Sequence, residues 1–145
     1  MKRFIFVIAL LFGVATAAKA DDRPIDITAL PRTAQQFIST HFGGATVVYA
    51  NQDRDLLDTD YEVRLSDGTK IDFNGSGEWT DISNKHTGVA MTVVPAALAA
   101  YVKQHYDSSL RILSLERDSR HYELKLSNGV ELIFSLNGKL IGFDD

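Results

Sequence analysis

Two stretches of the chain alternate apolar and charged residues, which is the pattern of a β-strand with one covered face. In residues 61–65 the apolar positions are Tyr61, Val63 and Leu65, and residues 122–126 repeat this alternation. Each stretch is followed by a glycine-containing turn and by a second run of alternating residues. Because successive strand residues point to opposite faces, we expect two β-hairpins in an antiparallel sheet with one apolar face.

The turns predict the pairing register of both hairpins. A three-residue loop with its glycine at positive φ, such as Gly68 in the first hairpin, places every apolar residue on one face. It pairs Leu65 with Thr69, Val63 with Ile71 and Tyr61 with Phe73 in the first hairpin, and Leu126 with Val130, Leu124 with Leu132 and Tyr122 with Phe134 in the second. A slip of one residue would turn either apolar set toward water, so the pattern specifies the register.

Helical periodicity precedes each hairpin. Apolar residues recur at helical spacing in residues 34–42 and 98–106, and each run follows a proline that suits the first turn of a helix. Helices of about three turns are stable only when they pack on something, so we expect them to cover the apolar face of the sheet. Each unit is completed by a short β-prone run and a closing strand, at 46–49 and 79–82 in the first and at 110–113 and 140–143 in the second.

The unit occurs twice. Pro31 and Pro95 are 64 positions apart, whereas Tyr61 and Tyr122 are 61 apart, so the first copy has a loop that is three residues longer. The predicted fold class is α+β, with two tandem α-β-β-β-β repeats and an antiparallel sheet that carries the helices on one face. Within one compact domain we assign the first repeat to residues 21–82, a polar linker to 83–91 and the second repeat to 92–145, with 21–27 as a loose leader.

Residues 1–20 predict export. Lys2 and Arg3 precede an apolar run over residues 4–14, and Ala18-Lys19-Ala20 provides a cleavage site, as in a secretory signal peptide. The apolar run is too short for an easy membrane span, so we expect a periplasmic or secreted protein with no membrane insertion after cleavage. The chain has no cysteine, which excludes disulfides, thiol catalysis and zinc–thiolate sites.

The charge of the chain excludes two classes of partner. There are 15 basic and 19 acidic residues, and three of the basic ones lie in the predicted signal peptide, which leaves a formal charge of −7 after cleavage. Nucleic acids and anionic membrane surfaces both attract positively charged proteins, so neither is an expected partner.

The order of these elements resembles the PepSY-like family of exported, mostly bacterial proteins. The likeness rests on a Leu-Pro helix start, a Tyr-x-Val-x-Leu-x-x-Gly hairpin and a Gly-x-Trp closing strand, namely Leu30-Pro31, Tyr61 to Gly68, Ile71, Phe73, Gly77 and Trp79 with their counterparts in the second repeat. The resemblance implies a β-lactamase-inhibitor-like fold, in which an exposed concave sheet binds an enzyme, and it brings no catalytic residues. Fold likeness is an analogy and not a sign of activity. The second repeat departs from the pattern, because Leu140 stands in place of the tryptophan.

Residues suited to catalysis or metal binding are sparse. None of the four histidines, His41, His86, His105 and His121, has a partner at the i, i+4 spacing of a helical ligand pair, so we interpret them as structural. The sequence shows no nucleophile elbow, no phosphate loop and no carboxylate pair in an apolar stretch. We therefore predict no enzyme, no catalytic residue, no metal site and no cofactor.

An acidic segment offers an alternative function. Asp53, Asp55, Asp58 and Asp60 fill the predicted longer loop of the first repeat and could supply oxygen ligands to calcium. The segment lacks the central glycine and the terminal glutamate of an EF-hand loop, which favours a solvated acidic loop. A small-ligand or calcium-binding envelope protein is therefore the alternative hypothesis.

The charged face of the sheet is the candidate binding site. From the predicted register, its partner-binding candidates are Glu62, Arg64, Lys70, Asp72, Lys125 and Glu131. We hypothesise an exported non-enzymatic module that binds an unidentified envelope or extracellular protein or peptide there, and inhibition of an envelope enzyme is one form of that binding. The competing interpretation is an ordinary solvated face, because binding hot spots are rich in aromatic residues. Trp79 is predicted to lie in the core, since leucine occupies the equivalent position.

Overall fold

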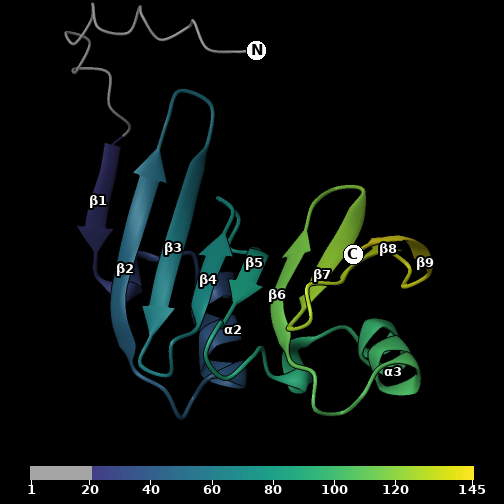
Figure 1. Cartoon of the computed structure of the whole chain (residues 1–145). Coiled ribbons are helices and arrows are strands. Elements are labelled where there is room, and N and C mark those ends of the chain that lie inside the picture. Colours follow the sequence, from purple (N-terminus) through teal and green to yellow (C-terminus); the bar gives the residue numbers. More distant parts are fainter. Residues whose placement is uncertain (1–20) are drawn as a thin grey trace, which may run out of the picture.

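The computed structural model describes residues 21–145 and confirms an α+β fold with helices on one face of an antiparallel sheet. The predicted signal peptide lies outside the described residues. The sheet has nine strands, and their order in space follows their order in the sequence (Figure 1). They are β1 (Asp21–Ile25), β2 (Val47–Arg54), β3 (Thr59–Leu65), β4 (Lys70–Phe73), β5 (Trp79–Ser83), β6 (Ile112–Arg117), β7 (His121–Leu126), β8 (Glu131–Ser135) and β9 (Leu140–Asp144).

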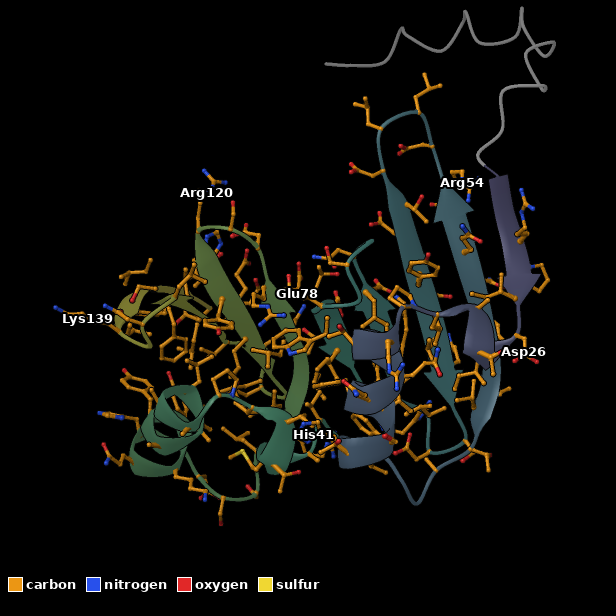
Figure 2. The ribbon with its side chains drawn as sticks, turned by 180° about the vertical axis from the view of Figure 1, so that it is seen from behind. Asp26, His41, Arg54, Glu78, Arg120 and Lys139 are labelled. Atoms are coloured by element: carbon orange, nitrogen blue, oxygen red, sulfur yellow. The ribbon has the colours of Figure 1, made fainter. Side chains whose placement is uncertain are left out.

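The helices begin where the sequence predicts them. Among residues 21–145, the α-helices α2 (Arg32–His41) and α3 (Ala96–His105) each start directly after a proline. Two short 3-10 helices, η2 (Ile27–Ala29) and η3 (Met91–Val93), precede them. The helix α2 lies behind the sheet in Figure 1 and in front of it in Figure 2, which shows the molecule from behind. Within residues 21–145, no helix is long and apolar enough to cross a membrane.

The two repeats pack their helices in the same way. Phe37 of α2 meets Phe73 of β4 edge-on with ring centroids 6.0 Å apart, and Tyr101 of α3 meets Phe134 of β8 edge-on at 5.5 Å. Such edge-to-face pairs are worth roughly 1 kcal/mol beyond the area that they bury. The duplication in the sequence is therefore a duplication of tertiary packing.

The predicted hairpin registers are confirmed. Val63 lies opposite Ile71 and Tyr61 opposite Phe73, and the same holds for the corresponding residues of β7 and β8. Next to the turns, the Leu65 N–H donates to the Thr69 carbonyl at 2.8 Å, and the Leu126 N–H donates to the Val130 carbonyl at 2.9 Å. The turn glycines Gly68 and Gly129 have φ values of 93° and 94°.

The prediction of a loose leader over residues 21–27 is wrong. Residues 21–25 form β1, which pairs antiparallel with β2, from Ile25 opposite Ala50 to Asp21 opposite Arg54. Backbone pairing needs no alternation of side chains, so the pattern does not reveal this strand. An edge position also tolerates Pro24, because a strand at the edge has one side without a partner.

The prediction that Asp53 to Asp60 fills a loop is also wrong. Asp53 lies opposite Asp60 as a paired residue of the β2–β3 hairpin, and only residues 55–58 connect the two strands. In this connection the Asp55 carboxylate accepts the N–H groups of Leu57 and Asp58 at 2.9 Å each. The end of the hairpin is polar on both faces, so its sequence does not alternate.

One line of residues on the helix-covered face crosses the whole sheet, and we call it the core row. Each strand contributes one residue, and each residue lies opposite the next: Ile25, Ala50, Val63, Ile71, Ile82, Leu115, Leu124, Leu132 and Phe143. The five central members, from Val63 to Leu124, have no exposed surface. Burying each such side chain stabilises the fold by about 1.5–3 kcal/mol.

Candidate functional site

The face of the sheet opposite the helices carries a line of carboxylates. Glu62 of β3 lies opposite Asp72 of β4, which lies opposite Asp81 of β5. Asp81 in turn lies opposite Glu116 of β6, and Glu116 opposite Glu123 of β7. We call these five residues the acidic row. Side chains directly opposite each other have Cβ atoms about 5 Å apart, so neighbouring carboxylates of the row repel one another.

The adjacent line of residues supplies cations only toward its two ends. It consists of Arg64, Lys70, Ser83, Ser114, Lys125 and Glu131. The Lys70 Nζ lies 3.5 Å from Glu62 and 3.3 Å from Asp72, and the Lys125 Nζ lies 3.8 Å from Glu131. Because serines occupy the middle, no ion pair within the described residues reaches Asp81 or Glu116.

Burial and mutual repulsion alter the protonation of the acidic row. Burial raises the pKa of the Asp81 carboxyl from its ordinary 3.8 to about 6, and the charges of Asp72 and Glu116 add to this shift. Burial also raises the pKa of Asp72, although Lys70 beside it acts in the opposite direction. For Lys70, burial by itself would lower the pKa, but the attraction of Asp72 and Glu62 outweighs it and raises the pKa. Asp81 therefore takes up a proton as the pH falls through about 6.

We expect Asp81→Asn to raise the melting temperature at neutral pH by about 4 °C, or on the order of 1 kcal/mol after allowance for partial exposure. Because the pKa of Asp81 is higher in the folded state than in the unfolded chain, its charged form lowers stability as the pH rises from about 4 to about 6. The gain should therefore be complete above that window and vanish near pH 4. Thermal melts across this range measure it.

Asp118→Asn is the control of opposite sign. The backbone N–H groups of Arg120 and His121 lower the pKa of the Asp118 carboxyl, so this carboxylate contributes stability that is present at neutral pH and lost in acid. The variant should melt lower than the wild type at pH 7. A gain for Asp81→Asn that is equal at pH 4 and pH 8 would show that relief of a buried charge is not its cause.

Within residues 21–145, two of the larger hollows open on this face. The first, of about 400 Å³, is lined by acidic and amide side chains, among them Asn51, Asp53, Asp60 and Asp72. Burial raises the pKa of Asp60 there, and repulsion from Asp58 and Asp53 adds to the shift. Within residues 21–145, no three histidine or carboxylate side chains are arranged to hold a metal ion.

The second hollow, of about 370 Å³, lies beside the middle of the acidic row. It exists because Ser83 and Ser114 are small, and its rim includes Lys85, Glu116 and Lys125. A long side chain from a partner would find polar groups of both signs there.

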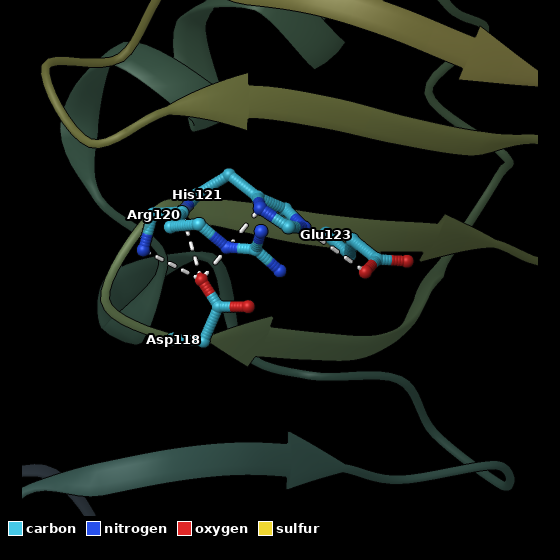
Figure 3. A network of polar contacts seen from close by, with 4 residues as sticks. All are labelled: Asp118, Arg120, His121 and Glu123. Atoms are coloured by element: carbon cyan, nitrogen blue, oxygen red, sulfur yellow. Dashed lines mark hydrogen bonds and ion pairs between the residues drawn. The ribbon is translucent and has the colours of Figure 1, made fainter.

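A polar cluster closes the end of the acidic row at Glu123 (Figure 3). His121 Nε2 lies 3.2 Å from the Glu123 carboxylate, and His121 Nδ1 lies 3.6 Å from Asp118. Asp118 also accepts the backbone N–H groups of Arg120 at 2.7 Å and of His121 at 2.9 Å.

The six residues predicted as partner-binding candidates all lie on the face opposite the helices, where they form two groups. Glu62, Lys70 and Asp72 make one ion-pair cluster with Arg64 beside it. Lys125 of β7 and Glu131 of β8 form a second ion pair. The strands β5 and β6 separate these groups.

The central residues of the acidic row, Asp81 and Glu116, escape prediction from the sequence. A β-bulge lies in β5, where Phe73 pairs with Trp79 while Asp72 pairs with Asp81. Simple alternation from Trp79 would point Asp81 toward the helices, and the extra residue reverses this. The pairing of β5 with β6 then brings Glu116 beside Asp81. These strands are joined through η3 and α3 and not by a tight turn, so the sequence between them does not predict their register.

Trp79 lies in the core, as predicted, with 8% of its surface exposed. The Arg117 guanidinium lies over its ring, 4.2 Å from the centroid, and donates a hydrogen bond to the Trp79 carbonyl at 2.8 Å. The tryptophan of the first repeat therefore holds an arginine of the second, and the two repeats share one sheet.

Known proteins share both the sequence pattern and the fold. A family model described as "Putative beta-lactamase-inhibitor-like, PepSY-like" matches residues 16–67 and 59–142. The solved structure of "a putative calcium-regulated periplasmic protein" from Bacteroides thetaiotaomicron is 42% identical with a TM-score of 0.81, covering 86% of this chain and 98% of that one. Two structures from Bacteroides vulgatus, both described as putative periplasmic proteins and one as of unknown function, are 40% and 35% identical with TM-scores of 0.79 and 0.78. Each covers 86% of this chain and 98% or 99% of its own. A comparison with curated proteins finds no match.

Proposed function

The chain belongs to the PepSY-like, β-lactamase-inhibitor-like family, and we propose that it is an exported, non-enzymatic binding module that holds a protein or peptide on its open sheet face. The observation that carries this proposal is the acidic row, which crosses five strands on the face away from α2. The periplasmic descriptions of the similar structures support the exported location.

The chemistry of the face favours a partner segment that carries lysine or arginine. An apolar partner would bury the charges of Asp81 and Glu116 without compensation, which costs several kcal/mol per ion. Basic side chains would instead make charge-assisted hydrogen bonds with these carboxylates. The hollow beside Ser83 and Ser114 offers room for such a side chain. The negative net charge of the chain would also speed the encounter with a basic partner.

Inhibition of an envelope enzyme is the form of binding that we favour. The family description points to inhibitor-like proteins, and a wide sheet face can cover an enzyme surface without inserting a loop into it. On this proposal the enzyme presents a basic patch to the acidic row. Inhibition is then steric, and it weakens as the salt concentration rises.

Affinity capture tests the proposal. Residues 21–145, immobilised and crosslinked mildly in envelope extract of the native organism, are expected to retain one dominant partner. The double variant Asp81→Asn/Glu116→Gln should retain at least tenfold less, because it removes the two carboxylates of the acidic row that have no ion pair within residues 21–145. The control Asp58→Asn/Glu78→Gln makes the same charge change in turns away from the row and should retain the wild-type amount.

Reversal of Arg64 and Lys125 to glutamate separates two modes of docking. A basic partner should bind this variant at least as tightly as the wild type, whereas loss of binding would assign recognition to the cations. Equal capture by the wild type and the Asp81→Asn/Glu116→Gln variant would contradict docking through the acidic row.

Calcium binding is the second candidate function. It rests on the acidic hollow beside Asp60, where a cation would relieve the repulsion that helps to raise the pKa of Asp60. Because no three carboxylates within residues 21–145 converge on one point, the Asn51 amide and backbone carbonyls would have to complete the ligand set. One similar structure is described as calcium-regulated. An empty capture together with a calcium-dependent rise in melting temperature, absent with magnesium and lost in Asp60→Asn, would replace the first proposal by this one.

A further inference from the structure

The core row ends abruptly at the last strand. Its central members have no exposed surface, and Leu132 of β8 is 1% exposed, but the next residue, Phe143 of β9, is 66% exposed. Ile141 on the same strand is 60% exposed. Exposed apolar residues on an edge strand mark a place where another strand can add to the sheet.

The first repeat shows how such an edge is completed. Ile82 of β5 and Phe143 of β9 are equivalent, since each lies opposite the β4 or β8 residue of the core row, Ile71 or Leu132. In the first repeat, β6 pairs with the outer edge of β5 and places Leu115 opposite Ile82. Both side chains then have no exposed surface. Nothing within residues 21–145 pairs with the outer edge of β9.

The backbone of β9 offers the hydrogen bonds that β5 already uses. The Asn84 N–H, just after β5, donates to the Leu113 carbonyl across the pair at 3.0 Å. In an antiparallel strand, residues two apart direct their backbone N–H and C=O groups to the same neighbouring strand, so the backbone N–H and C=O of Ile82 also point to β6. The equivalent residues of the second repeat, Phe143 and Asp145, therefore direct their N–H and C=O groups to the free edge.

The two edges of the sheet differ. The strand β1 contains Pro24, which lacks a donor, and prolines are one means by which proteins block edge pairing. The strand β9 has no proline and places glycine at position 142, opposite Ile133. A glycine in an edge strand leaves room for a large side chain from a neighbouring strand.

We propose that the free edge of β9 takes up an extended segment of a partner protein as a tenth, antiparallel strand. The segment has an apolar residue opposite Phe143, in the way that Leu115 lies opposite Ile82. It has a lysine or arginine opposite Asp144. Asp144 lies opposite Glu131, and the cation that pairs with Glu131, Lys125, lies on the other side of Glu131, on β7. This surface is separate from the acidic row, and the proposal goes beyond the function proposed above.

Charge argues against a second copy of this chain as the occupant. Antiparallel pairing of two β9 strands with Phe143 opposite Phe143 would place the Asp144 residues of the two copies diagonal to each other. Like charges opposite or diagonal to one another destabilise a strand pair. A segment that carries lysine or arginine would instead be attracted by Asp144 and Asp145.

A peptide copied from β6 serves as the probe. It has the sequence of residues 111–117 with Ser114→Lys, which puts lysine opposite Asp144 and leucine opposite Phe143 in the register of the β5–β6 pair. The fluorescein-labelled peptide is titrated with residues 21–145 and followed by anisotropy, while amide chemical shifts locate the contact. We expect saturable binding with the largest shift changes in β9 and β8.

Two protein variants and one modified peptide test the proposed strand pairing at β9. Phe143→Ser, at a largely exposed position, should keep the melting temperature within about 2 °C and bind at least tenfold more weakly. A peptide methylated on the backbone nitrogen of the leucine opposite Phe143 should lose binding, since this amide would donate to β9. Asp144→Lys should prefer a peptide with glutamate in place of the lysine, which reverses the wild-type preference.

The outcomes separate this proposal from the function proposed above. The variant Asp81→Asn/Glu116→Gln should bind the probe as the wild type does. Shift changes confined to the acidic row or to β1, or binding that survives Phe143→Ser and backbone methylation, would overturn the β9 proposal. Sedimentation equilibrium that shows a dimer lost in Phe143→Ser would overturn it as well, because the occupant would then be a second copy.

Discussion

Replacing Asn84 with alanine is expected to lower the free energy of unfolding by about 3 kcal/mol, or roughly 10 °C in melting temperature. Asn84 is 2% exposed and uses its whole side-chain amide. Its Nδ2 donates to the Asp67 carbonyl at 3.1 Å and to the Thr69 hydroxyl at 3.2 Å, and its Oδ1 accepts two backbone N–H groups at 3.0 Å each. Alanine would leave these groups unpaired in a buried place, and that desolvation accounts for the large cost.

Asn128→Ala provides the matched control, measured in the same thermal and urea melts. Asn128 sits in the turn of the second hairpin, where its side chain accepts a single hydrogen bond, from the Val130 N–H at 3.1 Å, in an exposed place. Water can replace that bond, so the expected loss is below about 1 kcal/mol. If both variants lose the same free energy of unfolding, the hydrogen bonds of Asn84 to the first hairpin do not contribute the stability expected of them.

Gly77→Ala is expected to destabilise the protein by about 3 kcal/mol, from backbone strain and a steric clash together. Gly77 has a φ of 86°, a conformation that costs an L-residue about 1–2 kcal/mol. A Cβ on Gly77 would also lie 2.8 Å from the Pro31 Cβ and 3.0 Å from the Ala34 backbone nitrogen, at the start of α2. The helix would have to move away from the β4–β5 turn, and the packing of Phe37 on Phe73 would loosen with it.

Gly129→Ala separates the cost of the positive φ from the cost of the steric clash with α2. Gly129 has a φ of 94°, and nothing lies within 4 Å of a Cβ built there. Its replacement should therefore show only the backbone cost, about 1–2 kcal/mol, in chemical denaturation at constant m-value. Equal losses for Gly77→Ala and Gly129→Ala would mean that the close approach of α2 does not matter for stability.

The sequence by itself determines the hairpins, the helices and the face on which the six candidate residues lie. The alternation of Tyr61, Val63 and Leu65 with charged residues specifies a register, because a slip by one residue would expose the whole apolar set. The second half of the chain repeats this alternation, and the same argument therefore predicts the register of the second hairpin independently. Trp79 is placed in the core for the same reason, since its equivalent is leucine.

Only the tertiary structure decides how the two repeats meet. The bulge after Trp79 turns Asp81 to the open face, and the pairing of β5 with β6 sets Glu116 beside it. Both depend on contacts between segments far apart in the chain, which local side-chain patterns do not record. The burial of Asn84 and the strand character of residues 21–25 have the same origin, because partners distant in sequence supply their hydrogen bonds. Local alternation is fixed by which face is covered, whereas the order and ends of the sheet are fixed by which edges find a partner.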